Sequence, residues 1–407
     1  MAEKAPAAPR RRARTVRWIV LAAVLVFVTA LGIAHQRLGV GKPVGVDALC
    51  PFGGLETLGT LVTGGFLVRR IALSSVLLLG ATVGTAVVFR RAFCGRICPL
   101  GFLQELAGTV GRKVIGRRLT LPRALDRPAR LLKYVVLAAI LWLTWSAAEL
   151  VIRPYDPWAA YNHLTSADLF AEFGVGVAVL AIALAGSVVY DRFFCKYACP
   201  MGAFLGLISR FSLFKVRRDA ETCIDCKLCD RACPVGVAVS TAQTVTDPEC
   251  IDCGECVTAC PVEGALATGA RTAGGTRRLG PVAVALGSVA LFAALVVAAT
   301  ASGSFAWTMP TLAEEIGSGT DGASFDTALI KGSTTMAEVS DVAGIPPEVF
   351  TRVYGVPGSE QTGQLKVLKD TYGCSPGEVR AFVEAYRTDP AVVDSWVPGI
   401  AHVEEEH

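Results

Sequence analysis

Eight of the fourteen cysteines in this chain of 407 residues form two tandem runs. Three closely spaced cysteines, with a fourth before a proline, are the ligand pattern of a pair of [4Fe–4S] clusters. Because each cluster needs four thiolates, these runs constrain the local fold more tightly than any apolar pattern does. The runs are Cys223-x2-Cys226-x2-Cys229-x3-Cys233-Pro234 and Cys250-x2-Cys253-x2-Cys256-x3-Cys260-Pro261.

The order of the cysteines also predicts which thiol serves which cluster. In two-cluster ferredoxins the fourth cysteine of each run binds the other cluster. A zinc ribbon is the competing interpretation, but it needs isolated Cys-x2-Cys pairs at finger spacing. The sequence therefore predicts a protein that moves electrons. The expected ligand sets are Cys223, Cys226, Cys229 and Cys260 for cluster 1, and Cys250, Cys253, Cys256 and Cys233 for cluster 2.

The composition indicates a membrane protein. The chain is 52% hydrophobic and 18% charged, which is too apolar for an ordinary soluble domain of this length. Five stretches are nearly free of charge and close to the ~20 residues that a spanning helix needs. The first has no convincing cleavage site and is followed by more spans, so we expect a retained anchor. The five are Trp18–Ala34, Ile71–Phe89, Tyr134–Ile152, Gly174–Tyr190 and Pro281–Ser302.

The distribution of Lys and Arg predicts the orientation in the membrane. Basic residues cluster in the N-terminus, in 90–133, in 215–218 and in 271–278, which we assign to the cytoplasm. The loops 35–70 and 153–173 are poor in Lys and Arg, and the tail from Ser302 has 16 acidic and 6 basic residues. We therefore expect a multi-pass protein of a bacterial inner membrane, with a cytoplasmic N-terminus and ferredoxin domain and an extracytoplasmic tail. The overall charge of +4 requires no nucleic-acid partner, because the basic residues lie beside spans.

A second pair of cysteine motifs reveals an internal repeat. The segment 93–101, Phe-Cys-Gly-Arg-Ile-Cys-Pro-Leu-Gly, matches 194–202, Phe-Cys-Lys-Tyr-Ala-Cys-Pro-Met-Gly, and each follows an apolar span. The outer loops also correspond, with Cys50-Pro51 at the position of Asp156-Pro157. Spans 1–2 and 3–4 are thus predicted to be two copies of one helical hairpin. Parallel repeats of this kind imply a pseudo-two-fold axis along the membrane normal.

The axis predicts that the thiols of Cys94, Cys98, Cys195 and Cys199 come together at the cytoplasmic side. An i, i+4 spacing puts both thiols of each motif on one helical face. Four thiolates suit a third iron–sulfur centre or a zinc ion, and thiol–disulfide chemistry is a third option. The alternative is that small cysteines merely pack at helix ends, where Pro99 and Pro200 begin the next helix.

Together, these motifs resemble the NapH/NosR-type membrane polyferredoxins. The resemblance also includes Cys50-Pro51-Phe52-Gly53-Gly54-Leu55-Glu56 and covers about Trp18 to Ser302. It implies electron transfer between the quinone pool or a cytoplasmic donor and an extracytoplasmic reductase, without naming the acceptor. Where the NosR type has a Ser-Gly-Ala-Thr flavin attachment motif, this chain has only Ser318-Gly319-Thr320-Asp321, and it has no Cys-x-x-Cys-His. Neither covalent FMN nor c-type haem is expected.

A quinone or menaquinone site is expected near the outer loops. The ferredoxin clusters lie too far inside to reach an outer partner across ~30 Å of hydrocarbon, and quinol oxidation needs a proton acceptor. Cys50 is a candidate ligand, redox thiol or packing residue. Glu149 lies within a predicted span, where an ionisable group suggests function, although it also lies near enough to the span end to snorkel. The quinone-side candidates are Cys50, Glu56, Glu149, Asp156 and His163.

The predicted fold is an α-helical membrane bundle of about five spans, formed by two parallel-repeat hairpins, with an inserted two-[4Fe–4S] ferredoxin α+β domain. Capping boxes at Thr335 and Ser375, with apolar residues at helical spacing, predict a small all-α C-terminal domain from about residue 326. The expected boundaries are a basic disordered N-terminus 1–17, a four-helix membrane domain 18–214, the ferredoxin domain 215–272, a fifth transmembrane helix 279–302 and the acidic tail 303–407.

Three functions compete at this level. The leading one is a membrane electron conduit coupled to the quinone pool, as an electron carrier or quinol dehydrogenase subunit rather than a stand-alone enzyme. The second is a metal-reducing assembly factor for a respiratory oxidase. The third is a membrane redox sensor, for which the sequence offers no recognisable output domain.

Overall fold

The computed structural model divides into two units, Met1–Gln36 with Gly45–Ala306, and Arg37–Val44 with Trp307–His407. Each unit is described by itself. The structure describes residues 7–37, 43–45, 50–64, 70–116, 119, 121–147, 152–166, 169–272, 275–308, 311–316, 325–330, 332 and 334–398.

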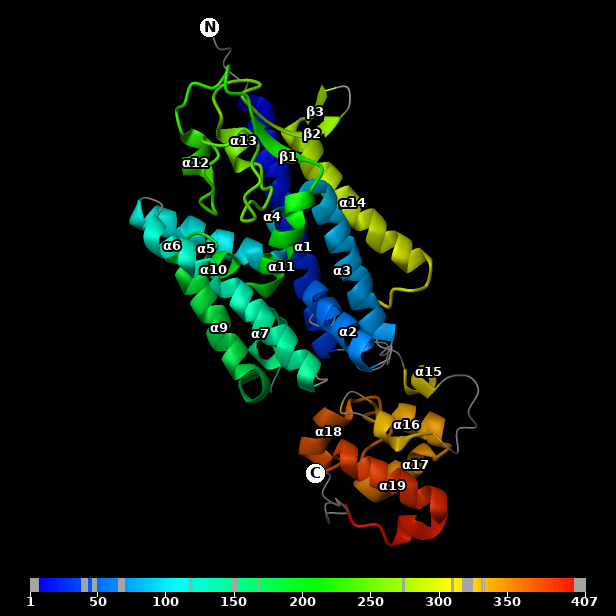
Figure 1. The fold of residues 1–407 in the computed structure, drawn as a ribbon. Helices are drawn as coiled ribbons and strands as arrows, with labels where there is room; N and C mark the ends of the chain where they lie inside the picture. The colour runs from blue at the N-terminus through cyan, green and yellow to red at the C-terminus, as the bar shows by residue number, and fades with distance from the viewer. Residues whose placement is uncertain are drawn as a thin grey trace. The chain divides into compact units, whose positions relative to one another are not determined.

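Four helices of the first unit are long and apolar enough to cross a membrane. They confirm the helical character of four of the five predicted spans. The remaining one, α3 (Arg70–Phe89), contains a shorter apolar helix, Leu73–Phe89, so its crossing stays a prediction. It packs against α14 (Figure 1). The four long segments are Arg11–Arg37 in α1 (Ala7–Arg37), Ala124–Ser146 over α6 (Arg123–Ala129) and α7 (Leu132–Ala147), α9 (Leu169–Val189), and α14 (Pro281–Ala301).

The N-terminal expectation is wrong from Ala7 onward. Helix α1 begins there, so most of the segment 1–17 that was expected to be disordered is helical. The arginines are compatible with a helix because Arg is a good helix former. One of them, Arg17, is 2% exposed and hydrogen-bonded within the unit.

The two repeats fold alike. After α3 and after α9, a turn leads into a five-residue helix, α4 (Ala92–Arg96) or α10 (Phe193–Tyr197). A helix with proline at its first position follows, α5 (Pro99–Ile115) or α11 (Pro200–Ile208), and the cysteine before each proline is the N-cap. The packing is reciprocal, because α5 contacts α9 and α11 contacts α3. Two shorter helices, α2 (Pro51–Gly64) and α8 (Pro157–Asn162), occupy corresponding positions in the repeats, and α2 packs on α3 as α8 packs on α9.

The ferredoxin region lies at the end of the bundle where α1 begins (Figure 1). It contains α12 (Leu228–Ala232), α13 (Glu255–Ala259) and an antiparallel sheet of order β1-β2-β3. Strand β1 (Lys215–Arg218) pairs with β2 (Leu266–Thr272) in the register Lys215↔Gly269. Strand β3 (Gly275–Leu279) pairs with β2, so the sheet extends past the predicted boundary at 272. The extension arises because the basic segment 275–279 folds back on β2 as a hairpin.

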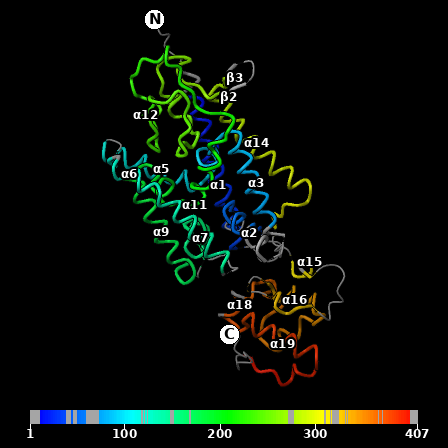
Figure 2. The backbone as a smooth tube through the Cα atoms, in the orientation of Figure 1, coloured from blue at the N-terminus to red at the C-terminus, as the bar shows by residue number. Residues whose placement is uncertain are grey.

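Within the second unit, the described helices surround one apolar core (Figure 2). Both predicted helix starts are capped: Thr335 and Glu338 form a full capping box, and Ser375 accepts from the amide of Glu378. The unit also includes part of the loop after α1, since the amide of Val44 donates to the carbonyl of Trp307 at 2.9 Å. Its helices are α15 (Leu312–Ile316), α16 (Met336–Ala343), α17 (Pro347–Tyr354), α18 (Leu365–Tyr372) and α19 (Pro376–Thr388), with 3-10 turns at Thr327–Leu329 and Pro390–Asp394.

Phe382 is fully buried in this core and contacts the rings of Phe350, Tyr354 and Trp396. Phe382→Ala is expected to destabilise the unit by about 3–5 kcal/mol, because it removes buried area and leaves a cavity. Hydrogen exchange of residues 334–388 in the purified full chain measures the loss. Val367→Ala, at a side chain that is 59% exposed on α18, is the matched control. Equal protection in the two variants would contradict the assigned core.

Candidate functional site

The first three cysteines of the first run and the last cysteine of the second run line one cavity. Its walls include Cys223, Cys226, Cys229 and Cys260, the four thiols expected to bind cluster 1. The crossed assignment therefore matches the shape of this region. A cavity bounded by four converging thiols fits a [4Fe–4S] cluster.

The other four cysteines also converge. Cys256 lies within electrostatic range of Cys253, Cys250 and Cys233, so the last cysteine of the first run joins the second set. Burial raises the pKa of Cys256 well above its ordinary value, and that of Cys253 to about 12. Such thiols stay protonated near neutral pH unless a metal ion binds the sulfur, because metal binding is coupled to thiol deprotonation.

The backbone explains how three thiols of one short run meet. Asp225 and Lys227 in the first loop, and Asp252 and Gly254 in the second, have positive φ angles between 51° and 78° at matching positions. Left-handed residues turn the chain back on itself, at a conformational cost for all but glycine. Each loop therefore curls round a point instead of continuing as a strand or helix.

A third group of thiols lies in and directly after the short helices α4 and α10 of the two repeats. We name Cys94, Cys98, Cys195 and Cys199 the thiol quartet. Cys199 is within electrostatic range of the other three, as predicted from the two-fold axis. Both motifs present their second thiol in the same way, because the sulfur of Cys98 accepts from the amide of Gly101 and that of Cys199 from the amide of Gly202.

Two buried arginines lie against the thiol quartet with the same two-fold relation. Arg91 of the first repeat contacts Gly202 of the second, where a Cβ would stand 2.7 Å from its guanidinium. Arg192 of the second repeat contacts Gly101 of the first, where the distance would be 2.9 Å. The glycines thus make room for the guanidinium groups beside the sulfurs. Two fixed positive charges favour a bound centre with negatively charged thiolate ligands.

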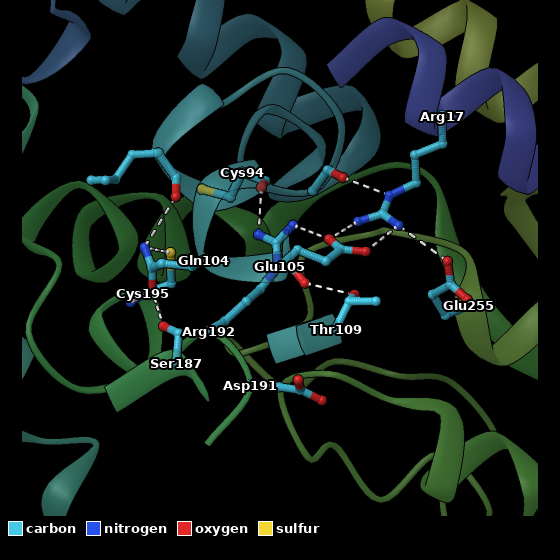
Figure 3. Close-up of polar contacts among 12 residues, drawn as sticks. Arg17, Cys94, Gln104, Glu105, Thr109, Ser187, Asp191, Arg192, Cys195 and Glu255 are labelled. Carbon is cyan, nitrogen blue, oxygen red and sulfur yellow. Dashed lines mark hydrogen bonds and ion pairs between the residues drawn. The ribbon is translucent and has the colours of Figure 1, made fainter. Parts of the chain in front are cut away.

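The surroundings of the quartet are not fully symmetric (Figure 3). Gln104 donates from its side-chain amide to the sulfur of Cys195 at 3.2 Å, and its Oε1 accepts from the amide of Cys195. The second repeat has Leu205 at the matching position. Hydrogen bonds to sulfur change the reduction potential of iron–sulfur centres. Gln104 donates such a bond to Cys195, whereas Leu205 has no side-chain donor for Cys94.

A buried ion network connects the surroundings of the quartet with Glu255 of helix α13 (Figure 3). Glu105 accepts from both Arg17 and Arg192, and Arg192 also donates to the carbonyl of Cys94 at 2.8 Å. Arg17 donates to Glu255 at 3.1 Å, on helix α13, which also carries Cys256. Burial alone would raise the pKa of Glu105, but the two guanidinium groups outweigh it and lower the pKa to about 2. Glu105 therefore stays ionised and holds the two arginines in place.

All of the cysteines are free thiols in the structure. None of the fourteen, all of which lie in described parts of the chain, forms a disulfide. Among the described residues, no group of three or more His, Cys, Asp or Glu side chains is spaced to hold a single metal ion. A cubane cluster holds its four thiolates farther apart than one tetrahedral ion does.

At the opposite end of the repeats, the structure brings three quinone-side candidates together. Cys50 is within electrostatic range of Asp156 and Glu56. Glu56 is 2% exposed and accepts a hydrogen bond of 3.0 Å from Thr144. Helix α2, which carries Glu56, is outside the candidate spans. Burial raises the pKa of Glu56 to about 7, against the lowering effect of the Thr144 bond and with support from Asp156. Its carboxyl group can therefore exchange a proton near neutral pH.

The remaining candidates lie elsewhere. His163 stacks on Phe173 with ring centroids 4.2 Å apart, and its Nδ1 is 2.9 Å from the carbonyl oxygen of Ala159. It is a buried, packed histidine at the end of α8. Glu149 is outside the described residues.

Sequence reasoning missed the arginines and the residues that hold them. The available signal was the matched position of Arg91 and Arg192, each three residues before the first cysteine of its motif. Gln104 and Glu105 carried no such signal, because the second repeat has Leu205 and Gly206 in their places.

Two family models match the chain in these regions. A model described as a 4Fe-4S binding domain matches residues 71–118 and again 173–219, so each match contains one Cys-x3-Cys-Pro motif. A 4Fe-4S dicluster domain matches residues 215–261, which contain both ferredoxin runs. No solved structure matches the chain.

Several known proteins are similar over the same part of the chain. The putative electron transport protein YccM of Escherichia coli is 34% identical over 210 residues, which are 51% of this chain and 58% of YccM. The uncharacterized protein MJ0750 of Methanocaldococcus jannaschii is 30% identical over 194 residues, 47% of this chain and 75% of that protein. The regulatory protein NosR of Pseudomonas aeruginosa is 30% identical over 149 residues, 36% of this chain and 20% of NosR. The chain thus spans only part of the length of YccM and NosR.

Fold, thiol arrangement and similarity define an iron–sulfur electron-transport protein with membrane helices. The chain belongs to the NapH/NosR-type membrane polyferredoxins.

The crossed ligand sets make a direct spectroscopic prediction. Cys260→Ser is expected to give the same EPR spectrum as Cys226→Ser, because both remove a ligand of cluster 1. Cys233→Ser is expected to match Cys253→Ser, since both alter cluster 2. The measurement is EPR of the four dithionite-reduced variants. A Cys233→Ser spectrum identical to that of Cys226→Ser would show that the fourth cysteines do not cross.

Proposed function

We propose that the protein conducts electrons between the quinone pool, or a cytoplasmic donor, and an extracytoplasmic reductase. The cluster-bearing end is cytoplasmic in this proposal, and the Cys50–Glu56 end faces outward. The basic regions beside the predicted spans and the acidic tail support this orientation. The description of YccM as a putative electron transport protein supports the general function.

The observation that carries the proposal is the proximity of the quartet to the second cluster. Arg192 is within electrostatic range of both Cys195 of the quartet and Cys253 of cluster 2. Two ferredoxin clusters outside the bundle would leave ~30 Å of hydrocarbon uncrossed. A centre held by the quartet extends the path from the ferredoxin region into the repeats.

The quartet residues are proposed to hold a third [4Fe–4S] cluster. Cys94, Cys98, Cys195 and Cys199 provide four ligands, and Arg91 and Arg192 offset the negative charge of the thiolates. When bound, such clusters accept or release one electron each. The match of a 4Fe-4S binding domain model to both halves of this site supports the same ligand.

The group formed by Cys50, Glu56 and Asp156 is proposed as the quinone-binding side of the protein. Oxidation of a quinol to a quinone releases two electrons and two protons, and the protons need an acceptor. Glu56 fits this role because its carboxyl group is buried, hydrogen-bonded to Thr144 and titrates near neutral pH.

The cluster count tests the proposed third centre. Anaerobically purified protein is expected to contain about twelve irons and twelve sulfides per chain, the content of three [4Fe–4S] clusters. Cys94→Ala and Cys195→Ala are expected to lower the count to about eight. Cys374→Ala, which alters a buried thiol of the C-terminal core, is the matched control and leaves the count unchanged. Eight irons in the unaltered protein would refute a third cluster.

Glu56→Gln is expected to slow oxidation of a menaquinol analogue by at least about 100-fold, the contribution of a positioned general base. Only the carboxylate accepts a proton, so the unaltered protein should oxidise quinol faster as pH rises through about 7, and the variant should lose this rise. Stopped-flow reduction of the clusters measures both rates. Thr57→Val, on the same helix, is the control. An unchanged pH profile in Glu56→Gln would contradict the assignment.

A further inference from the structure

The turn after α3 in the first repeat forms several hydrogen bonds with the loop that carries the second cysteine run. We name residues 90–96 the docking turn and residues 245–253 the second-cluster loop. Arg90 donates to the carbonyls of Val245 and Asp247 at 2.9 and 2.5 Å. Arg91 donates to the carbonyl of Pro248 at 2.9 Å, and Arg96 to that of Asp252 at 2.8 Å.

These bonds are buried and directed at the backbone. Arg90, Arg91 and Arg96 are each at most 3% exposed. Charged donors in a water-poor environment form stronger hydrogen bonds than neutral ones. The acceptors of these bonds are carbonyl oxygens, and Arg91 and Arg96 also pair with the carboxylates of Glu249 and Asp252 at 3.7 and 3.5 Å. The arginines therefore hold the loop through both its backbone and its side chains.

The matching positions of the second repeat serve the bundle instead. Asp191, at the position of Arg90, pairs with Arg112, and Tyr197, at the position of Arg96, donates to Asp126 at 2.6 Å. Arg192, at the position of Arg91, binds Glu105 and the carbonyl of Cys94. Two turns that are alike in sequence motif and helix pattern therefore have different partners.

Gly95 explains why the loop can approach only one of them. A Cβ at Gly95 would overlap the carbonyl oxygen of Ile251 and stand 3.3 Å from the amide nitrogen of Cys253. Both neighbours are backbone atoms of the second-cluster loop, so a side chain here cannot be accommodated by a rotamer change. The second repeat has Lys196 at this position, buried and 3.7 Å from Asp126.

The loop of the first set is partly open to solvent, although Cys229 and Cys260 are buried. Ile224, which lines the cluster 1 cavity, is 57% exposed. Cys253 of the second set, by contrast, is within electrostatic range of Arg17 of α1, and Cys250 is within range of Arg90. The two ferredoxin sites thus differ in environment, with the second set turned toward the bundle.

From these contacts we infer that the docking turn is a positioning device, in which Gly95 and the three arginines hold the second-cluster loop against the thiol quartet. Cluster 2 is then the neighbour of the quartet, and cluster 1 is the terminal open to a cytoplasmic partner. The inference deepens the proposed function and rests on it for the identity of the third centre. The contact between the docking turn and the second-cluster loop does not depend on that identity.

Gly95→Ala tests the inference, with Gly80→Ala as the matched control. Gly80 lies on α3 with nothing within 4 Å of an added Cβ. Gly95→Ala is expected to keep the iron content of the unaltered protein and to speed amide exchange in residues 245–253 about tenfold, since backbone bonds of the loop are loosened. It should also weaken the magnetic interaction between cluster 2 and the neighbouring centre, measured by EPR relaxation. Arg96→Gln should shift both readouts in the same direction.

The outcomes separate the two proposals. Exchange and EPR relaxation that stay unchanged in both Gly95→Ala and Arg96→Gln would overturn the positioning role. If the unaltered protein holds about eight irons, the third cluster fails, and the exchange measurement still decides whether the docking turn holds the loop. If Gly95→Ala does not fold, Arg96→Gln provides the decision.

Discussion

The structure depends on the pairing of buried arginines at the junction between the helix bundle and the ferredoxin region. Arg17, Arg90, Arg91, Arg96 and Arg192 are nearly inaccessible to solvent. A buried charge is costly unless it is paired and hydrogen-bonded. Here the partners are Glu105, Glu255 and the carbonyls of one loop, so the requirement to satisfy these charges brings α1, α5, the docking turn and the second-cluster loop together.

At the same junction, some contacts follow the pseudo-two-fold relation between the repeats and others do not. The pseudo-two-fold relation is preserved in the Cys-x3-Cys-Pro thiols and in the reciprocal contacts of Arg91 with Gly202 and Arg192 with Gly101. It is lost where a single ferredoxin region must bind to one of two similar ends. Symmetric ligands suit a centre on the axis, whereas an asymmetric contact is needed to give that centre one neighbouring cluster. The two repeats differ at this contact because the first has Gly95, which leaves room for the second-cluster loop, and the second has Lys196 in its place.

Much of the candidate site was predictable because its signals are local. The spacing of the two runs predicted the crossed sets, and in the structure Cys260 lines the same cavity as Cys223, Cys226 and Cys229. The matched motifs predicted that Cys94 and Cys199 lie close together, and the two thiols are near enough to interact electrostatically. Capping at Thr335 and Ser375 was predictable for the same reason, since a cap depends on residues three apart. The helix over residues 7–17 was missed because a basic segment rich in Ala and Pro favours disorder in sequence reasoning, whereas Arg17 at its end pairs with the distant residues Glu105 and Glu255.

By itself, the sequence determined the kinds of ligand, the number of cysteine sets, the apolar helices and the family. These properties follow from residue spacing and composition, which can be read directly from the sequence. Only the tertiary structure decided which repeat receives the second-cluster loop, which arginines lie beside which sulfurs, and that Cys50, Glu56 and Asp156 share one environment while His163 packs on Phe173. Most of those outcomes depend on backbone approach and on the pairing of buried charges between segments that are far apart in the chain, such as Arg192 with Glu105 and Arg17 with Glu255, and no local pattern encodes such pairings.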